Sequence, residues 1–483
     1  MLAVPLVLHS LGSALYGVWV MGGALIMIQG LFDLGVGAAL VRFVAVAAAR
    51  GSRPTVVIIF RRALAFYLAL SLAVSIPLLI WAGELASLLP SVHTAAESQV
   101  AVLIRYVAVA FALTNVTLVL ASLLQGVGRV DAAFRGQTLG WLLYVPILAI
   151  GIQFAGAAQA VGLAWVCCYL LQVVWLSASA QLAVGELSNV EVAAPSFREM
   201  LALGGWWQLS SWADFATFQL PRLAGGFVLS ASALVELDVA LRAAQLVVAP
   251  LSAVFPLVLP VAARAWTNRG EEGLRLFLER WFLPGAIGLW LCAVTFIPVE
   301  QLALAAWTGR AAHTFNLWLN ASVLVGTAAH SSTGLFSSAL LATGNISPVL
   351  RFKKRQLILA LVLVPLALIG GPVPTGIALG IALTLPALAF NRDQVGVFRL
   401  HLPSHGSTVW RRLAAATAIL LTALSAGVWL LGGVLPAWPI ALILLPLWAV
   451  TCVLGWLWCW NGWLDREGRH TPHPAPDAGR AAF

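Results

Sequence analysis

Long apolar segments follow one another through almost the whole sequence. A helix needs about 20 mostly apolar residues to cross a membrane. Segments of that kind lie at 15–43, 57–82, 99–124, 136–155, 157–182, 200–229, 234–262, 276–298, 315–343, 355–371, 374–391, 409–432 and 437–463. The opening residues 2–12 (LAVPLVLHSLG) match only the second half of another span. We therefore expect an all-α polytopic membrane protein with about fourteen transmembrane helices, the first of them truncated.

The composition agrees with a membrane protein and limits its partners. The chain is 61% hydrophobic and 9% charged, whereas soluble domains are about 25% charged. Its net charge of +9 fits cytoplasmic loops that face anionic lipid better than a nucleic-acid surface. All five cysteines lie inside apolar segments, which favours buried thiols over a disulfide framework or a metal site. We expect membrane lipids as partners, and no nucleic acid, metal or cofactor.

Arginine and lysine mark one side of the membrane. The basic loops contain Arg50, Arg53, Arg61, Arg62, Arg129, Arg135, Arg264, Arg269, Arg275, Arg280, Arg351, Lys353, Lys354, Arg355, Arg392, Arg399, Arg411 and Arg412. The loops on the opposite side are short, and Arg310 is their single arginine or lysine. The positive-inside rule places the basic loops and the C-terminus in the cytoplasm.

The two halves of the chain share a sequence pattern. SLLQGVGRVDAAFR (122–135) matches SALLATGNISPVLR (338–351), and Val-Pro pairs at 145–146 and 364–365 keep nearly the same offset, as do Gly162 and Gly380. An even number of spans separates the copies, which indicates parallel repeats. Such repeats typically form two lobes around a site near the membrane midplane and work by alternating access.

This pattern divides the chain into five parts. We expect an N-lobe of helices 1–6 at 1–182, a cytoplasmic linker at 183–199, a C-lobe of helices 7–12 at 200–391, two extra helices at 392–463 and a disordered cytoplasmic tail at 464–483.

Three arginines fall inside predicted spans, where charge is costly and is often functional. Arg105, Arg222 and Arg242 would each lie about 10 Å below the outer surface. Guanidinium groups bind phosphate bidentately and stay charged, so the three arginines suggest an anionic, phosphate-bearing substrate. Arg242 follows Asp238 by four residues, so a structural ion pair explains it equally well.

Two aspartates are candidates for a coupling-ion site or for polar contacts within a lobe. Asp33 has Arg105 as a potential partner on another helix. Asp214, Phe218 and Arg222 are spaced by steps of four, which would place Asp214 and Arg222 on one helix face about 12 Å apart. His330, among small hydroxyl residues, is interpreted as a hydrogen-bonded core histidine rather than a proton carrier.

No enzyme signature is present. The sequence contains no GxSxG, P-loop or HExxH motif. The chain is therefore predicted to be a transporter rather than an enzyme, and one that does not itself hydrolyse ATP.

Several motifs resemble one known family. LGSALYGVW (11–19), FDLGVGAALVRFVA (32–45) and the run that begins QLPRLAGGFVLSASALVELDVALR (219–242) are similar to the polysaccharide flippases. These form the O-antigen translocase branch of the multidrug/oligosaccharidyl-lipid/polysaccharide exporter superfamily. The likeness extends from Leu11 to about residue 460.

The resemblance implies a fold, an activity and a location. It implies two six-helix lobes plus two C-terminal helices in the bacterial cytoplasmic (inner) membrane. It implies a flippase that moves undecaprenyl-(pyro)phosphate-linked oligosaccharide to the periplasmic leaflet for surface polysaccharide biosynthesis, with polysaccharide polymerase or chain-length machinery as further partners. Asp33, Gly35 and Arg42 match the family's second-helix motif, and Arg222 matches its basic residue near the end of helix seven. The chain departs from the pattern at Pro221, Glu236 and Asp238, which weakens the role inherited by Arg222.

Two other functions remain open from the sequence. A cation-coupled multidrug antiporter of the same superfamily would use carboxylates and aromatic faces to hold its substrate. A membrane-embedded polymerase or glycosyltransferase would need a large external loop, and the loops on that side are short.

Overall fold

The computed structural model describes residues 3–88, 97–190, 193–252, 255–309, 316–400, 408–432, 443–455 and 457. Helices make up nearly all of these residues, and their one β-type pairing is the bridge between Ser52 and Asn189. Eight helical spans within the described residues are long and apolar enough to cross a membrane: Leu15–Phe32, Arg53–Ile80, Glu97–Gly126, Val130–Phe154, Ala157–Gly185, Ala265–Thr308, Pro372–Val397 and Arg411–Val428. The chain is thus a multi-helix, all-α membrane protein, and the expected count of fourteen spans remains a prediction.

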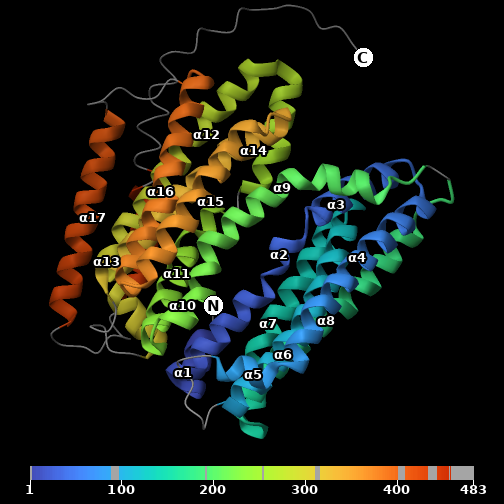
Figure 1. Ribbon diagram of the computed structural model, residues 1–483. Helices are drawn as coiled ribbons and strands as arrows, with labels where there is room; N and C mark the ends of the chain where they lie inside the picture. The colour runs from blue at the N-terminus through green and yellow to red at the C-terminus, as the bar shows by residue number, and fades with distance from the viewer. Residues whose placement is uncertain are drawn as a thin grey trace, which may run out of the picture.

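The helices of the first half gather into one bundle, which we call the first bundle (Figure 1). It contains α1 (Ala3–Ile26), α2 (Gln29–Phe32), α3 (Val36–Ala49), α4 (Arg53–Ile80), α5 (Ala82–Ser87), α6 (Glu97–Gly126), α7 (Val130–Phe154) and α8 (Ala157–Gly185). Most side chains of α6 are buried, because α6 packs against α3, α4 and α8 at once.

The second half forms a second bundle beside the first (Figure 1). It contains α9 (Phe197–Phe218), α10 (Leu220–Val228), α11 (Ala231–Ser252), α12 (Phe255–Thr308), α13 (Leu317–Ser332), α14 (Gly334–Thr343), α15 (Ser347–Leu368), α16 (Pro372–Val397) and α17 (Thr408–Gly432). The long α12 bends at Gly270, whose φ of 57° lies in the left-handed region.

The bundles touch through two helices. Helix α1 packs against α6 of its own bundle and also against α10 and α11 of the second. Helix α9 crosses from the second bundle to contact α2 and α3 of the first, as Figure 1 shows. Because these contacts join different helices at different levels, the bundles meet at two separate places.

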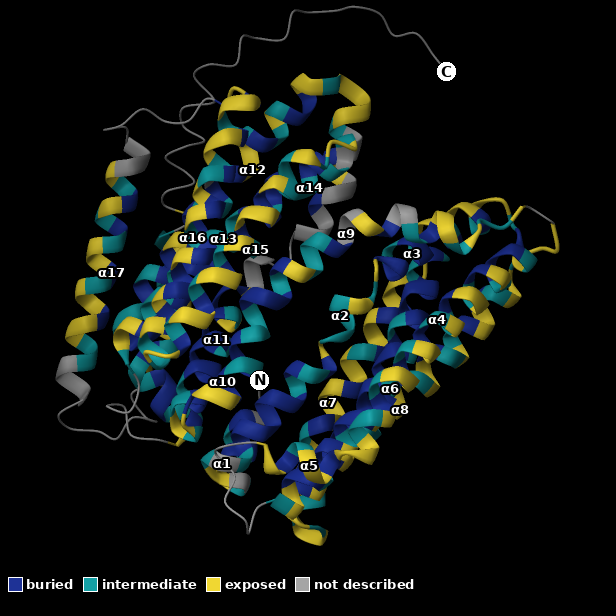
Figure 2. Cartoon of the chain, in the orientation of Figure 1, coloured by how far each residue is buried: buried dark blue, intermediate teal, exposed yellow. Residues whose placement is uncertain are grey.

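Exposed residues, yellow in Figure 2, lie on the outward faces of both bundles, and many of them are large apolar residues. On α4, Leu68, Leu72 and Ile76 are exposed at steps of four. Phe154 and Ile369 are 86% and 80% exposed. Such surfaces suit contact with lipid tails, since a soluble protein rarely exposes large apolar patches.

Three predicted continuous spans are interrupted, which corrects the sequence-based expectation. One of them, 315–343, divides at Thr333 between α13 and α14. The span 15–43 breaks on both sides of α2, and Leu34 and Gly35 take positive φ values of 51° and 72° before α3 begins. The span 200–229 breaks at Gln219, between α9 and α10. Pro221 explains the break at Gln219, because proline has no N–H to donate and its ring clashes with the preceding turn.

The predicted repeat has a structural counterpart. Gly128 and Gly344 take φ values of 88° and 76° in the turns α6–α7 and α14–α15, and Pro146 and Pro365 both lie inside the following helix. A left-handed turn that requires glycine thus occurs at matching positions in both halves. The exact lobe boundaries remain a prediction.

A candidate substrate cavity between the bundles

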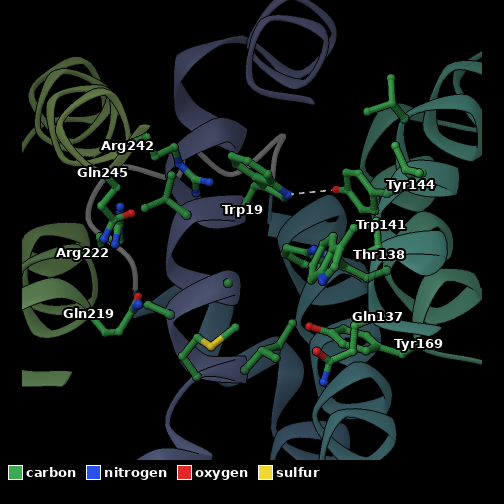
Figure 3. A pocket seen from close by; sticks show the side chains of 18 of the residues that line it. Trp19, Gln137, Thr138, Trp141, Tyr144, Tyr169, Gln219, Arg222, Arg242 and Gln245 are labelled. Carbon is green, nitrogen blue, oxygen red and sulfur yellow. Dashed lines mark hydrogen bonds between the residues drawn. The ribbon is translucent and has the colours of Figure 1, made fainter. Parts of the chain in front are cut away.

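A cavity of about 670 Å³ lies between the two bundles (Figure 3). One wall, here called the cationic wall, comes from α10, α11 and the residue before α10. The other, here called the aromatic wall, comes from α1, α7 and α8 of the first bundle. The cationic wall contains Gln219, Arg222, Arg242 and Gln245, and the aromatic wall contains Trp19, Trp141, Tyr144, Trp165 and Tyr169.

A fully buried aspartate organises the cationic wall. Asp238 of α11 accepts hydrogen bonds from Nε of Arg222 at 2.7 Å and from Nε of Arg242 at 2.6 Å. The Tyr16 hydroxyl of α1 donates to the same carboxylate at 2.7 Å. A buried charge needs such partners to offset its desolvation. Two guanidinium groups share one carboxylate, so the cluster has a formal charge of +1.

Arg222 is held by its own helix break. Its backbone N–H bonds to the Gln219 carbonyl, so the Phe218 carbonyl lacks its usual partner four residues on. Nη1 of Arg222 donates to that Phe218 carbonyl at 2.6 Å. The interruption caused by Pro221 therefore fixes both the backbone and the direction of the Arg222 side chain, which is 6% exposed.

Arg242 keeps hydrogen-bond donors free at the cavity. Its guanidinium carbon lies 4.6 Å from the ring centre of Trp19, in cation–π geometry. Among the described residues, only Asp238 accepts a hydrogen bond from Arg242, and it does so at Nε. The terminal amino groups thus remain available to an anion, and the side chain is 21% exposed.

Contacts between rings hold the aromatic wall together. Trp19 donates from Nε1 to the Tyr144 hydroxyl at 3.2 Å and stacks on Trp165 with an interplanar angle of 10°. Trp141 packs against Tyr144 and Tyr169, with ring centres 5.8 Å and 5.7 Å apart. Four of the rings are buried by these contacts, and Trp141, which is 43% exposed, offers the largest ring surface of the wall.

Arg105 does not reach this cavity, contrary to the expectation that it binds substrate with the other two arginines. Its side chain is exposed on α6, while its neighbours Leu103, Ile104 and Val107 are buried. The face of α6 that carries Arg105 points out of the first bundle. Spacing along the sequence predicts the depth of a residue but leaves open which face the bundle buries.

Asp33 lies in the break between α2 and α3, away from the cavity lining. Its Oδ1 accepts a hydrogen bond from the Tyr67 hydroxyl of α4 and another, at 3.1 Å, from the Gly37 amide. Tyr67, rather than the expected Arg105, is therefore the partner of Asp33 in the structure. The contact stays within the first bundle and caps the start of α3.

Asp214 belongs to a separate polar cluster in the second bundle. Lys353 of α15 lies 2.6 Å from its Oδ1, and Nε2 of His330 on α13 lies 3.8 Å from the same atom. The break at Gln219 removes the continuous face expected to connect Asp214 with Arg222. Lys353 is nearly buried, although the basic run RFKKR had suggested a cytoplasmic anchor.

The aromatic wall was not predicted, although the sequence contains a signal for it. Trp141 and Tyr144 are three residues apart, and Trp165 and Tyr169 are four apart. Such spacings place each pair on one helix face. The sequence indicates Asp238 as a partner of Arg242 and, with Glu236, as an acid that Arg222 could reach. That one carboxylate binds both arginines depends on how α10 packs against α11.

Comparison with known proteins identifies the fold. No protein-family model and no curated protein sequence matches the chain. Among solved structures, it is similar to an inward-facing multidrug resistance MATE transporter of the MOP superfamily, with 17% identity over 82% of this chain and 94% of that one and a TM-score of 0.62. It is also similar to the lipid II flippase MurJ in an inward closed conformation, with 11% identity over 95% and 99% and a TM-score of 0.56.

These similarities show the fold of the chain. The chain has the fold of the solved MATE transporter and MurJ flippase structures. The fold that the sequence resemblance implies is thereby confirmed, and the family and its activity remain predictions.

Proposed function

We propose that this chain is a flippase that moves undecaprenyl-(pyro)phosphate-linked oligosaccharide from the cytoplasmic to the periplasmic leaflet by alternating access. The observation that carries the proposal is the pair of arginines in the inter-bundle cavity. Arg242 offers unpaired amino groups there, and the Arg222–Asp238–Arg242 cluster has a formal charge of +1. A phosphate group matches both the charge and the fork geometry of a guanidinium.

The opposite wall suits the sugar. The cavity of about 670 Å³ lies within the range of small-molecule sites, roughly 300–1,000 Å³. It has room for a phosphorylated head group and its first sugars, while the lipid tail stays in the bilayer. The ring face of Trp141, which is 43% exposed, would contact the apolar face of a sugar, and Gln137 and Thr138 add polar groups beside it.

A multidrug cation antiporter is the second candidate, and the aromatic wall favours it. Aromatic faces attract organic cations, and Trp19 already holds a cation in the form of Arg242. The net positive charge of the cationic wall opposes this function, because a cationic substrate in the cavity would lie close to two guanidinium groups.

The test is transport by the purified, reconstituted protein. Proteoliposomes would receive a fluorescent undecaprenyl-pyrophosphate-linked oligosaccharide, and its translocation would be measured by protection from an external quencher. Arg242→Gln should slow translocation at least about tenfold, the effect expected for losing a charge-assisted phosphate contact. Arg105→Gln is the matched control, since Arg105 lies outside the cavity, and should translocate at the wild-type rate.

Wild-type translocation by Arg242→Gln would contradict the phosphate site. Transport of an organic cation such as ethidium in the same vesicles, with no lipid translocation, would favour the antiporter instead.

A further inference from the structure

The break between α1 and α3 leaves two backbone carbonyls without partners in their own helix. We call residues 27–35 the hinge segment. In a continuous helix, the carbonyls of Gly30 and Leu31 would accept from the amides four residues later. Leu34 and Gly35 have left-handed φ values here, so their amides point elsewhere. In a bilayer, an unpaired carbonyl is costly because no water is present to replace the lost bond.

The second bundle supplies the missing donors. Nε2 of Gln208 on α9 donates to the carbonyls of Gly30 and Leu31 at 2.8 Å and 2.9 Å. Nε1 of Trp212 donates to the Leu31 carbonyl at 2.9 Å. Side chains of the second bundle therefore donate hydrogen bonds to backbone carbonyls of the first.

The same face of α9 also approaches the backbone of the first bundle closely. Gly204, Gln208 and Trp212 follow one another at steps of four, which places them in one stripe along α9. A Cβ atom on Gly204 would overlap the backbone of Gly35, and one on Gly35 would overlap Gly204. A Cβ atom added to Gly205, the next residue, would have no neighbouring atom within 4 Å.

The hinge segment is fixed within its own bundle. The Tyr67 hydroxyl of α4 binds the Asp33 carboxylate at the centre of the break. Met27, which lines the cavity, follows the last residue of α1 and lies in the turn into α2. A movement of α9 relative to the first bundle therefore acts on the segment that borders the cavity.

We propose that the hinge segment and the Gly204–Gln208–Trp212 stripe form an inter-bundle latch that breaks when the bundles separate during transport. The contact has two favourable arrangements: a dry one, in which Gln208 and Trp212 pair the carbonyls, and an open one, in which water does so. This inference rests on the proposed alternating access. The latch gives a functional reason for the helix break at Asp33–Gly35, which the cavity does not explain.

Hydrogen–deuterium exchange of the purified full-length protein tests the latch. Gly204→Ala and, separately, Gln208→Met should each speed amide exchange in peptides covering 28–38 by about tenfold, because each weakens closure. Gly205→Ala is the matched control and should exchange like the wild type. Gln208→Met removes the donors without adding bulk, so the test does not depend on Gly204→Ala folding.

Unchanged exchange in both latch variants overturns the proposal. So does faster exchange throughout the chain with a lowered melting temperature, since that result describes ordinary packing. Translocation should also fall several-fold in Gln208→Met. These results are separable from the proposed substrate, because exchange at 28–38 does not depend on Arg242 or on any lipid-linked sugar.

Discussion

The two walls of the cavity use different chemistry although they come from halves of the chain that share a repeated turn. The cationic wall holds two arginines on one buried aspartate, and the aromatic wall holds five rings in mutual contact. The matching glycines Gly128 and Gly344 preserve the helix turns in both halves. The repeat therefore keeps the scaffold, while each half supplies a different kind of wall to the cavity.

The largest loss of stability is expected from removing Asp238, the anion of the cationic wall. Asp238→Ala would leave Arg222 and Arg242 close together and unpaired in a buried site. Breaking a buried ion pair costs about 3–5 kcal/mol, so the melting temperature of the detergent-purified protein should fall sharply. Asp393→Ala is the control, because Asp393 is exposed and its nearest partner, Arg355, is 3.9 Å away. Equal melting temperatures for the two variants would show that Asp238 does not organise the wall.

A smaller effect is expected from the polar cluster outside the cavity. Lys353→Met removes the ammonium group 2.6 Å from Asp214, whose side chain is 43% exposed. Because that exposure lets water solvate the carboxylate, the loss of stability should be only about 1 kcal/mol. Binding of the lipid substrate, measured by quenching of a labelled lipid, should not change. A large loss of affinity would show that the substrate site also includes the cluster of Asp214 and Lys353.

The aromatic wall should matter for the sugar alone. Trp141→Leu removes one ring whose side chain is already 43% exposed, so folding should be little affected. Affinity for the lipid-linked oligosaccharide should fall about threefold, the size of one aromatic contact. Affinity for undecaprenyl pyrophosphate without sugar should stay the same. Equal losses of affinity for both lipids would show that the aromatic wall does not bind the sugar specifically.

The smallest effect is expected at Tyr144. Tyr144→Phe deletes the acceptor of the Trp19 N–H and keeps the ring, so the stability should fall by about 0.5–1 kcal/mol. Chemical denaturation of the variant beside the wild type measures the difference. A loss as large as that of Asp238→Ala would mean that the hydrogen bond, and not ring packing, supports the aromatic wall.

The sequence predicts the helices better than their orientation. Apolar segment lengths identify an all-α membrane protein because bilayer thickness sets the length of a span. The glycines at 30, 35 and 37 allow close helix packing or a bend near Asp33, but hydropathy stays high through the breaks at Gly35 and Gln219 and does not locate them. Arg105 and Lys353 were misplaced for a related reason. Whether an intramembrane charge faces the lipid, the cavity or a partner is decided by packing between helices distant in sequence.

The family motif at 32–45 illustrates the same limit. It predicted the superfamily fold, yet its aspartate binds Tyr67 and neither an arginine nor the cavity. The glycine that follows, Gly35, is required by its positive φ and by the close approach of Gly204. Both features depend on elements far along the chain, so the motif alone could not disclose them.

The central claim is that Arg242 and Arg222 hold a phosphate group, and lipid binding measures this directly. Purified wild type and Arg242→Gln would be titrated with undecaprenyl pyrophosphate and with uncharged undecaprenol. We predict that Arg242→Gln binds the pyrophosphate lipid at least about tenfold more weakly, while both proteins bind undecaprenol equally. Equal affinity of the two proteins for undecaprenyl pyrophosphate would contradict the account.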